Sequence, residues 1–180
     1  KEFLRVDIKP QYETSLGKLA SLIYSFKESR DNLIIQDVGE GFVRDLYSTY
    51  ISFLEPNKFV YKLPIYQDDR GVFVEMLKTF NSGQFSYFTA HPGITRGGHY
   101  HHTKTEKFLV IKGEACFRFK NIISNESHEV ISSGLVPQVI ETVPGWSHDI
   151  TNIGNDEMIV MLWANEIYNR DFPDTITYEV

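Results

Sequence analysis

The chain has 180 residues, of which 42% are hydrophobic and 14% aromatic, which is enough for one globular domain with a short appendage. Its net charge is −6, from 18 Lys and Arg against 24 Asp and Glu, and this acidity without a basic run argues against a nucleic-acid partner. The single cysteine, Cys116, excludes an internal disulfide and favours a reducing, cytoplasmic location.

The N-terminus shows neither a signal-peptide layout nor an initiator Met, so we expect this chain to be part of a longer protein. No apolar run reaches the roughly 18 residues that span a bilayer. Two amphipathic helices are predicted, over residues 14–29 and 40–54, and Pro56 ends the second. Because these helices have little partner sequence, they must pack on the downstream domain, on a second copy or on missing sequence.

From residue 59 onward, short runs of alternating polarity are separated by turn residues. The predicted strands are 59–63, 72–77, 85–90, 99–102, 107–112, 114–120, 128–131, 136–143, 149–151 and 158–165. Many short strands at this spacing are typical of a sandwich or barrel and not of alternating β-α units. The fold class is therefore predicted as mainly β, preceded by two short helices.

A candidate metal site stands in the stretch between Gly93 and Gly113. Two histidines, His99 and His101, are two residues apart, so that on a strand both imidazoles point the same way. The turn at Pro144-Gly145 would return a third histidine to the same interior. The predicted ligands of a divalent metal are His99, His101, Glu106 and His148, a set that suits zinc, iron, manganese or nickel.

These spacings resemble the two sequence motifs of the cupin family. Gly-x5-His-x-His-x4-Glu-x6-Gly over residues 93–113 matches the first motif at every defined position. Gly-x2-His-x3-Asn over residues 145–152 resembles the second, although its proline directly precedes the glycine and the usual upstream glycine is missing. The resemblance implies a jelly-roll barrel whose metal is held by the four predicted ligands.

Two further stretches are similar to motifs of the dTDP-4-keto-6-deoxyglucose 3,5-epimerase family. They are Asp-Arg-Gly-x-Phe-x-Glu over residues 69–75 and Arg-Gly-x-His-Tyr over residues 96–100. In that family the first motif helps to hold a nucleotide sugar, and a guanidinium matches phosphate oxygens bidentately. The predicted substrate-binding residues are Arg70, Glu75, Arg96 and Lys107.

The whole chain, through residues 61–75 and 163–168 in particular, resembles the C-terminal half of bifunctional capsular polysaccharide synthesis enzymes of the CapF type. The resemblance implies a zinc cupin, and a homodimer, that epimerises C3 of a UDP-2-acetamido-2,6-dideoxy-4-keto-hexose. An N-terminal short-chain dehydrogenase/reductase domain would then reduce C4 with NADPH, on the route to UDP-N-acetyl-L-fucosamine. Residues 1–56 are accordingly predicted as the end of the reductase domain and residues 57–180 as the cupin.

The chain shows no Gly-x-x-Gly-x-x-Gly after a strand, and its one Tyr-x-x-x-Lys lies on a predicted strand, so reductase activity is not expected from it. Epimerisation next to a C4 ketone needs a base, an acid and a positive group near the enolate oxygen. The candidate catalytic residues are Lys104, His102, Tyr100, Tyr87 and Asp149.

Two other interpretations stay open at this point. The cupin could be a non-catalytic binding or dimerisation module with a structural metal, or it could be an iron-dependent dioxygenase. Oxygen uptake with Fe(II) would indicate the dioxygenase, and the Asp-Arg-Gly-x-Phe-x-Glu stretch would then have no explanation.

Overall fold

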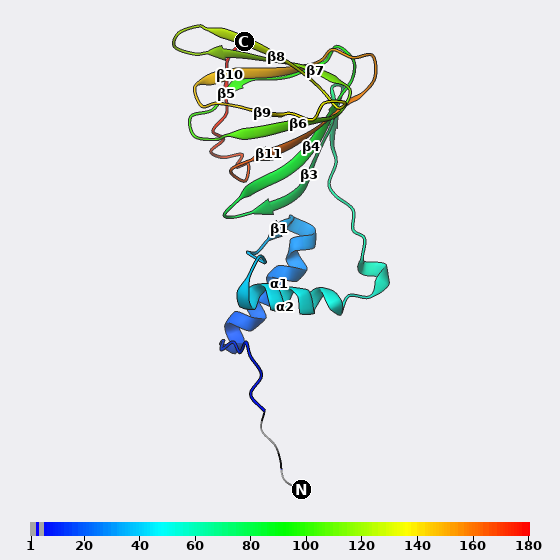
Figure 1. The fold of residues 1–180 in the computed structure, drawn as a ribbon, viewed down its shortest axis with the longest axis vertical. Helices are drawn as coiled ribbons and strands as arrows, with labels where there is room; N and C mark the ends of the chain where they lie inside the picture. The colour runs from blue at the N-terminus through cyan, green and yellow to red at the C-terminus, as the bar shows by residue number, and fades with distance from the viewer. Residues whose placement is uncertain (1–2, 4–5) are drawn as a thin grey trace. The chain divides into compact units, whose positions relative to one another are not determined.

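The computed structural model describes residues 3 and 6–180, and the chain forms two compact units, residues 1–60 and residues 61–180 (Figure 1). The first is largely helical and the second is built from strands. The assignment of residues 1–56 to a reductase domain stays a prediction. None of the helices in the described part of the chain is both long and apolar enough to cross a membrane.

The helical unit is organised around one buried aromatic side chain. Its elements are α1 (Leu16–Asn32), β1 (Ile34–Ile35), α2 (Gly41–Ser52) and the 3-10 helix η1 (Pro56–Lys58). Phe26 of α1 is 1% exposed and packs edge-on against Tyr47 of α2, with ring centroids 5.1 Å apart. Ser15 caps α1 by accepting a hydrogen bond from the Lys18 amide, as its residue type favours.

The second unit consists of two antiparallel sheets (Figure 1). One contains β2 (Tyr66–Asp68), β3 (Gly71–Thr79), β4 (Gly83–Ala90), β11 (Met158–Ala164), β6 (Glu106–Lys112) and β9 (Val139–Glu141), paired in that order. The other contains β12 (Ile176–Thr177), β5 (Thr95–Tyr100), β10 (Trp146–Asn152), β7 (Glu114–Asn121) and β8 (Ser127–Ser133), again in order. The predicted mainly-β jelly roll is confirmed.

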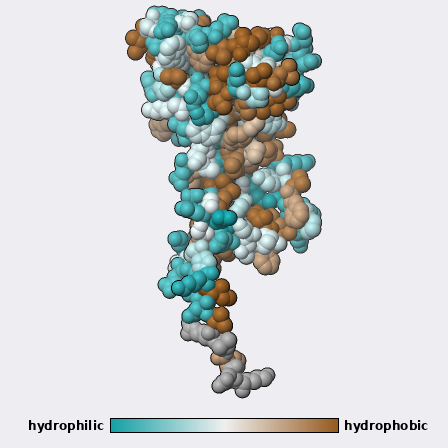
Figure 2. All heavy atoms as spheres, in the orientation of Figure 1, coloured by the Kyte–Doolittle hydropathy of each residue, from teal (hydrophilic) through white to brown (hydrophobic). Residues whose placement is uncertain are grey.

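Apolar side chains from both sheets fill the space between them. Phe88 and Phe108 of one sheet meet Phe117 of the other, with centroid distances of 6.4 Å and 5.8 Å around Phe108. Replacing Phe108 by Ala would cost about 3–5 kcal/mol of folding free energy, since it removes a buried ring and leaves a cavity. Other apolar residues reach the surface, where Figure 2 shows hydrophobic side chains gathered among hydrophilic ones.

Several predicted strands differ from the observed ones. Residues 59–63 form no strand, because they lie between η1 and Pro64 and pair with no neighbouring strand among the described residues. The strand predicted over 136–143 shrinks to β9, since Pro137 lacks the amide that a ladder needs. The strand predicted over 99–102 is the end of β5, and His101 lies just beyond it. The short strand β12 was not predicted.

Candidate metal centre

The two sheets bring the four predicted ligands to one place. His99 is the second-last residue of β5, His101 directly follows that strand, Glu106 begins β6 and His148 lies in β10. Their ligand atoms all lie within 4.8 Å of one another. The pairing of β10 with β5 sets His148 directly opposite His99, and β6 supplies the carboxylate from the other sheet.

A glycine makes this close approach of β5 and β10 possible. Gly97 has a φ of 98°, which side chains of L-residues rarely allow, and a Cβ there would lie 2.7 Å from the carbonyl oxygen of His148. The register of the two strands also shifts between His148 and Asp149. Any larger residue at position 97 would therefore push apart the two strands that carry His99 and His148.

The outer nitrogens of two histidines are tied to backbone carbonyls. Nδ1 of His101 donates to the carbonyl of Asp174, and Nδ1 of His148 lies 3.4 Å from the carbonyl of Trp146. Because a carbonyl can only accept, each Nδ1 carries the proton, and in the neutral ring each Nε2 then presents a lone pair.

Those lone pairs face a carboxylate. Nε2 of His101 and of His148 lie 3.2 Å and 3.3 Å from Oε2 of Glu106, and Nε2 of His148 has no hydrogen-bond partner among the described residues. Three acceptors turned toward one another need a positive charge between them. The residues therefore fit a divalent metal ion, with neutral imidazoles oriented by outer-shell carbonyls.

The charge states of the cluster agree with this fit. Burial, and then the neighbouring His148, lower the pKa of His99 to about 4, so its imidazole is neutral at pH 7. Burial acts to raise the pKa of Glu106, but the groups beside it, the Lys104 ammonium among them, outweigh burial and hold that pKa well below its usual range. Neutral imidazole and ionised carboxylate are the ligand forms that metals bind.

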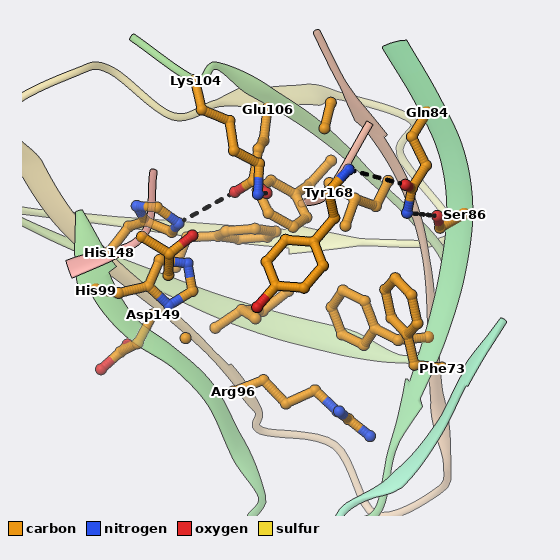
Figure 3. A pocket seen from close by; sticks show the side chains of 18 of the residues that line it. Phe73, Gln84, Ser86, Arg96, His99, Lys104, Glu106, His148, Asp149 and Tyr168 are labelled. Carbon is orange, nitrogen blue, oxygen red and sulfur yellow. Dashed lines mark hydrogen bonds and ion pairs between the residues drawn. The ribbon is translucent and has the colours of Figure 1, made fainter. Parts of the chain in front are cut away.

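The cluster closes one end of a cavity of about 330 Å³, a size suited to a small-molecule ligand (Figure 3). Its walls combine aromatic rings with a few polar groups. The aromatic residues are Phe73, Phe88, Phe108, Phe117 and Tyr168, and the polar ones include Arg70, Glu75, Gln84, Ser86, Arg96 and Lys104.

Lys104 joins the cluster from the loop between β5 and β6. Its Nζ lies 3.0 Å from Oε1 of Glu106, and its side chain is 10% exposed. The same Nζ stands 5.9 Å from the ring centre of Tyr168. Figure 3 shows the Lys104 side chain descending toward Glu106, with the Tyr168 ring across the cavity. A buried cation and a phenol thus border the same space.

Two arginines occupy another part of the wall. Nε of Arg96 donates to the carbonyl of Thr89 at 3.0 Å, while its Nη2 is buried without a hydrogen-bond partner among the described residues. Burial, and then the charge of Arg70, lower the pKa of Arg96. Arg70 is more exposed and forms an ion pair with Asp68. Because its Nη2 is buried and has no hydrogen-bond partner among the described residues, Arg96 is a better candidate than Arg70 for binding an anion.

Some predicted site residues are not brought to the cavity. Lys107 is exposed on the outer face of β6 and pairs with Glu141. Alternation along the strand explains this, since Glu106 points inward. His102 is exposed as well, and the Tyr100 ring packs against it at 5.4 Å. Tyr87 alternates with the cavity-lining Ser86 and Phe88 of β4 and therefore faces the other side.

Two more predicted residues border the cavity, but the carboxylate of each forms an ion pair with a basic side chain. The carboxylate of Asp149 accepts from Nε of Arg118 at 2.9 Å and points away from the cavity in Figure 3. Glu75 forms an ion pair with Lys78 at 2.6 Å and accepts from the Gln84 amide. Neither carboxylate is free to carry a proton or to bind a sugar without first losing these contacts.

The sequence prediction missed two residues of the segment between β11 and β12. Tyr168 lines the cavity, and its backbone amide donates to Gln84 at 3.3 Å. Asp174 holds the loop that carries Lys104. Partial burial acts to raise the pKa of Asp174, but hydrogen bonds from the loop amides outweigh it and lower that pKa. The segment has no strand or helix periodicity, so no pattern pointed to either side chain.

The part of the chain that carries this site matches a known protein family. A family model described as the polysaccharide biosynthesis C-terminal domain matches residues 66–176. The chain belongs to this family. The matched range contains the four candidate ligands, Lys104 and both arginines of the cavity, so the whole site lies within what defines the polysaccharide biosynthesis C-terminal domain.

Longer relatives agree with this assignment. A Pseudomonas aeruginosa protein, UDP-2-acetamido-2,6-beta-L-arabino-hexul-4-ose reductase, is 57% identical over 175 residues, which make up 97% of this chain and 47% of that protein. The crystal structure of the capsular polysaccharide assembling protein CapF from Staphylococcus aureus matches with a TM-score of 0.90 at 40% identity, covering 95% of this chain and 47% of that one. CapF with the inhibitor 3-isopropenyl-tropolone matches with a TM-score of 0.89 at 40% identity, over 94% of this chain and 49% of that one.

The chain thus spans about half the length of these relatives. The resemblance to CapF that the sequence predicts is confirmed, and with it the cupin type of fold. The names of these relatives refer to sugar-nucleotide reduction and capsular polysaccharide assembly, and each name describes a protein about twice as long as this chain.

Proposed function

We propose that this chain is a metal-dependent epimerase domain acting at C3 of a UDP-2-acetamido-2,6-dideoxy-4-keto-hexose. The observation that carries the proposal is the cavity itself. Three imidazoles and a carboxylate converge at one end beside a buried Lys104, and Arg96 offers an unpartnered Nη2 in another wall. A sugar with an acidic carbon and a diphosphate needs both kinds of group.

The substrate class rests on the Pseudomonas relative, whose name gives a UDP-linked 2-acetamido hexul-4-ose, a sugar with a ketone at C4. A ketone at C4 acidifies the hydrogen on C3 because the resulting carbanion is an enolate. Removing that proton and returning one to the opposite face inverts C3, and every bond lost is remade. No oxidant or reductant is needed, which suits a chain without a nucleotide-cofactor motif.

A divalent metal held by His99, His101, Glu106 and His148, most simply Zn²⁺, would supply positive charge for the enolate oxygen. Lys104 adds a second positive group, because its ammonium lies beside Glu106 in a water-poor pocket. His99, as a ligand, would have no lone pair left for a proton. The base and the acid must then come from other side chains.

We assign removal of the C3 proton to the phenolate form of Tyr168, and return of a proton to the opposite face to the ammonium of Lys104. Of the five candidate catalytic residues from the sequence, Lys104 is the one whose functional group points into the cavity. The Tyr168 hydroxyl extends into the same cavity in Figure 3. Inversion requires two proton carriers that act on opposite faces of the sugar ring.

The arginines would hold the diphosphate. Nη2 of Arg96 is buried and unpaired, so a phosphate oxygen would replace nothing when it binds there. Arg70 would have to exchange its contact with Asp68 for the phosphate. The NADPH-dependent reduction of C4 belongs, in this proposal, to the N-terminal domain of the longer protein, and the homodimer stays a prediction from resemblance.

Solvent deuterium exchange tests the proposal. The protein is stripped of metal, reloaded with Zn²⁺ and incubated in D₂O with the UDP-4-keto sugar, while NMR follows the C3 proton. We expect the C3 signal to disappear with the reloaded protein and to persist with the stripped one. Absence of exchange with the metal-loaded protein would refute the epimerase.

A further inference from the structure

One carboxylate outside the ligand cluster holds together the loop that carries His101 and Lys104. Oδ1 of Asp174 accepts from the His102 amide at 2.8 Å, and Oδ2 accepts from the amides of Thr103 and Lys104 at 2.7 Å and 2.9 Å. The Thr103 hydroxyl donates to the same Oδ2 at 3.0 Å. Four donors from three consecutive residues therefore converge on one side chain.

The same residue also contacts a candidate ligand directly. The backbone carbonyl of Asp174 accepts the Nδ1 proton of His101, which leaves Nε2 of that ring facing Glu106. The carboxylate and the carbonyl thus act on neighbouring targets. Without the hydrogen bonds between the Asp174 carboxylate and the loop, the Asp174 carbonyl would lose the fixed position from which it orients the imidazole of His101.

The segments on both sides of Asp174 connect it to β5 and to the cavity wall. On the C-terminal side β12 pairs with β5, where Ile176 lies opposite Tyr100 and Thr177 opposite His99. On the N-terminal side the segment runs back to Tyr168, which lines the cavity. Asp174 is therefore the point at which an irregular segment is fastened to the loop of the candidate metal centre.

We propose that Asp174 is a positioning residue, which fixes the tautomer and orientation of His101 and the placement of Lys104. This inference rests on the proposed function in one respect, that the cluster binds a metal. Asp174 touches neither ligand atom nor cavity, so its effect must pass through His101 and the loop. Outer-shell partners of this kind typically change metal affinity by about 10–100-fold when they are removed.

Two substitutions and a control from the same segment separate this role from general stability. Asp174→Ala removes all four acceptor contacts, whereas Asp174→Asn keeps one oxygen that can still accept from the Thr103 and Lys104 amides. Asp171→Ala removes an exposed carboxylate three positions away and serves as the matched control. Thermal unfolding of each variant shows whether it is folded, and if Asp174→Ala is not, Asp174→Asn decides.

The first measurement is the dissociation constant for Co²⁺ or Zn²⁺, by competition with a chelator, on the full chain. We expect Asp174→Ala to weaken binding about 10–100-fold, Asp174→Asn to weaken it less, and Asp171→Ala to leave it unchanged. Equal affinity in wild type and folded Asp174 variants would overturn the proposal, even if those variants melt earlier.

The second measurement needs no metal. Long-range ¹H–¹⁵N NMR of the metal-free protein reports which nitrogen of His101 carries the proton. We expect Nδ1–H in wild type, and a mixture of tautomers in the Asp174 variants with His148 unaltered. An unchanged His101 tautomer would overturn the positioning role. Wild type that binds no metal would refute the metal centre instead, and the tautomer would still decide the role of Asp174.

Discussion

At the end of the cavity that holds the histidines, each charged group has its neighbour in place. Lys104 contacts Glu106 at 3.0 Å, and backbone carbonyls fix the rings of His101 and His148. In the arginine wall, Nη2 of Arg96 is buried without a hydrogen-bond partner among the described residues, and Arg70 forms an ion pair with the exposed Asp68. The charged groups at the histidine end are therefore paired within the protein, whereas the arginine wall keeps an unpaired buried donor.

Under the proposed function, this difference would let one cavity serve both binding and chemistry. Groups that stabilise a transient charge work best when they are already fixed, because no reorganisation is needed during the reaction. Groups that bind a diphosphate gain from being unpaired beforehand, since no internal contact must be broken. Substitutions at the histidine end should therefore affect turnover, and those at the arginine end should affect binding.

The largest effect is expected from His148→Ala, which removes one ligand from the histidine end. Metal binding should weaken by more than about 100-fold, because even outer-shell losses cost about 10–100-fold, and C3 exchange should vanish with it. His128→Ala, on the exposed face of β8, is the control and should behave as wild type. Competition titration with a chelator measures the affinity, and a His148→Ala protein that still binds the metal tightly would contradict this ligand set.

Lys104→Met separates turnover from metal binding at the same end. The metal should still bind, since no ligand is lost, while the rate of C3 exchange should fall by about 10²–10⁴-fold, the usual contribution of a positioned proton carrier. Lys107→Met is a close control, because Lys107 carries the same charge on the same strand region but points outward. An exchange rate within threefold of wild type would remove Lys104 from the mechanism.

Arg96→Gln tests the arginine end. The dissociation constant for UDP, measured by calorimetry, should rise by about 10–100-fold, as expected for the loss of a charge-assisted hydrogen bond. The maximal exchange rate should stay within a few-fold of wild type. Arg170→Gln, an exposed arginine, provides the charge-matched control. A lower maximal rate with unchanged UDP binding would contradict the assignment of Arg96 to substrate binding.

The smallest effect is expected from Asp68→Asn, which frees Arg70. UDP binding should tighten by about two- to fivefold, because exposed ion pairs contribute little. The hydrogen bonds from Arg70 lower the pKa of Asp68 to about 2. The carboxylate of Asp68 is therefore fully ionised throughout the neutral pH range. This pair should accordingly give UDP binding no pH dependence between pH 5 and 8, and a strong dependence that disappears in Asp68→Asn would contradict the pKa.

The sequence was sufficient for the ligand cluster and for the jelly roll, since both depend on short-range patterns. The two histidines and the carboxylate of the first motif lie within eight residues, and alternation along a strand predicts that the two imidazoles point the same way. Alternation also predicts that Lys107 faces outward when Glu106 faces inward. That argument was available from the sequence and proves to be the right one for the geometry.

What the sequence did not reveal depends on contacts between distant segments. Asp174 lies 70 residues from Lys104 along the chain, in a stretch without periodicity, and its role follows only from where β12 pairs. Tyr168 comes to the cavity through the same segment. Asp149 looked free because its partner Arg118 stands on the neighbouring strand β7, and cross-strand register cannot be read from composition.

The central claim is that a metal at His99, His101, Glu106 and His148 is required for chemistry at C3. The most direct measurement is the rate of deuterium incorporation at C3 as Zn²⁺ is added to stripped protein, with bound metal quantified by elemental analysis. We expect a rate that rises in proportion to bound metal and saturates at about one ion per chain. Full exchange in metal-free protein, or none at saturation, would contradict it.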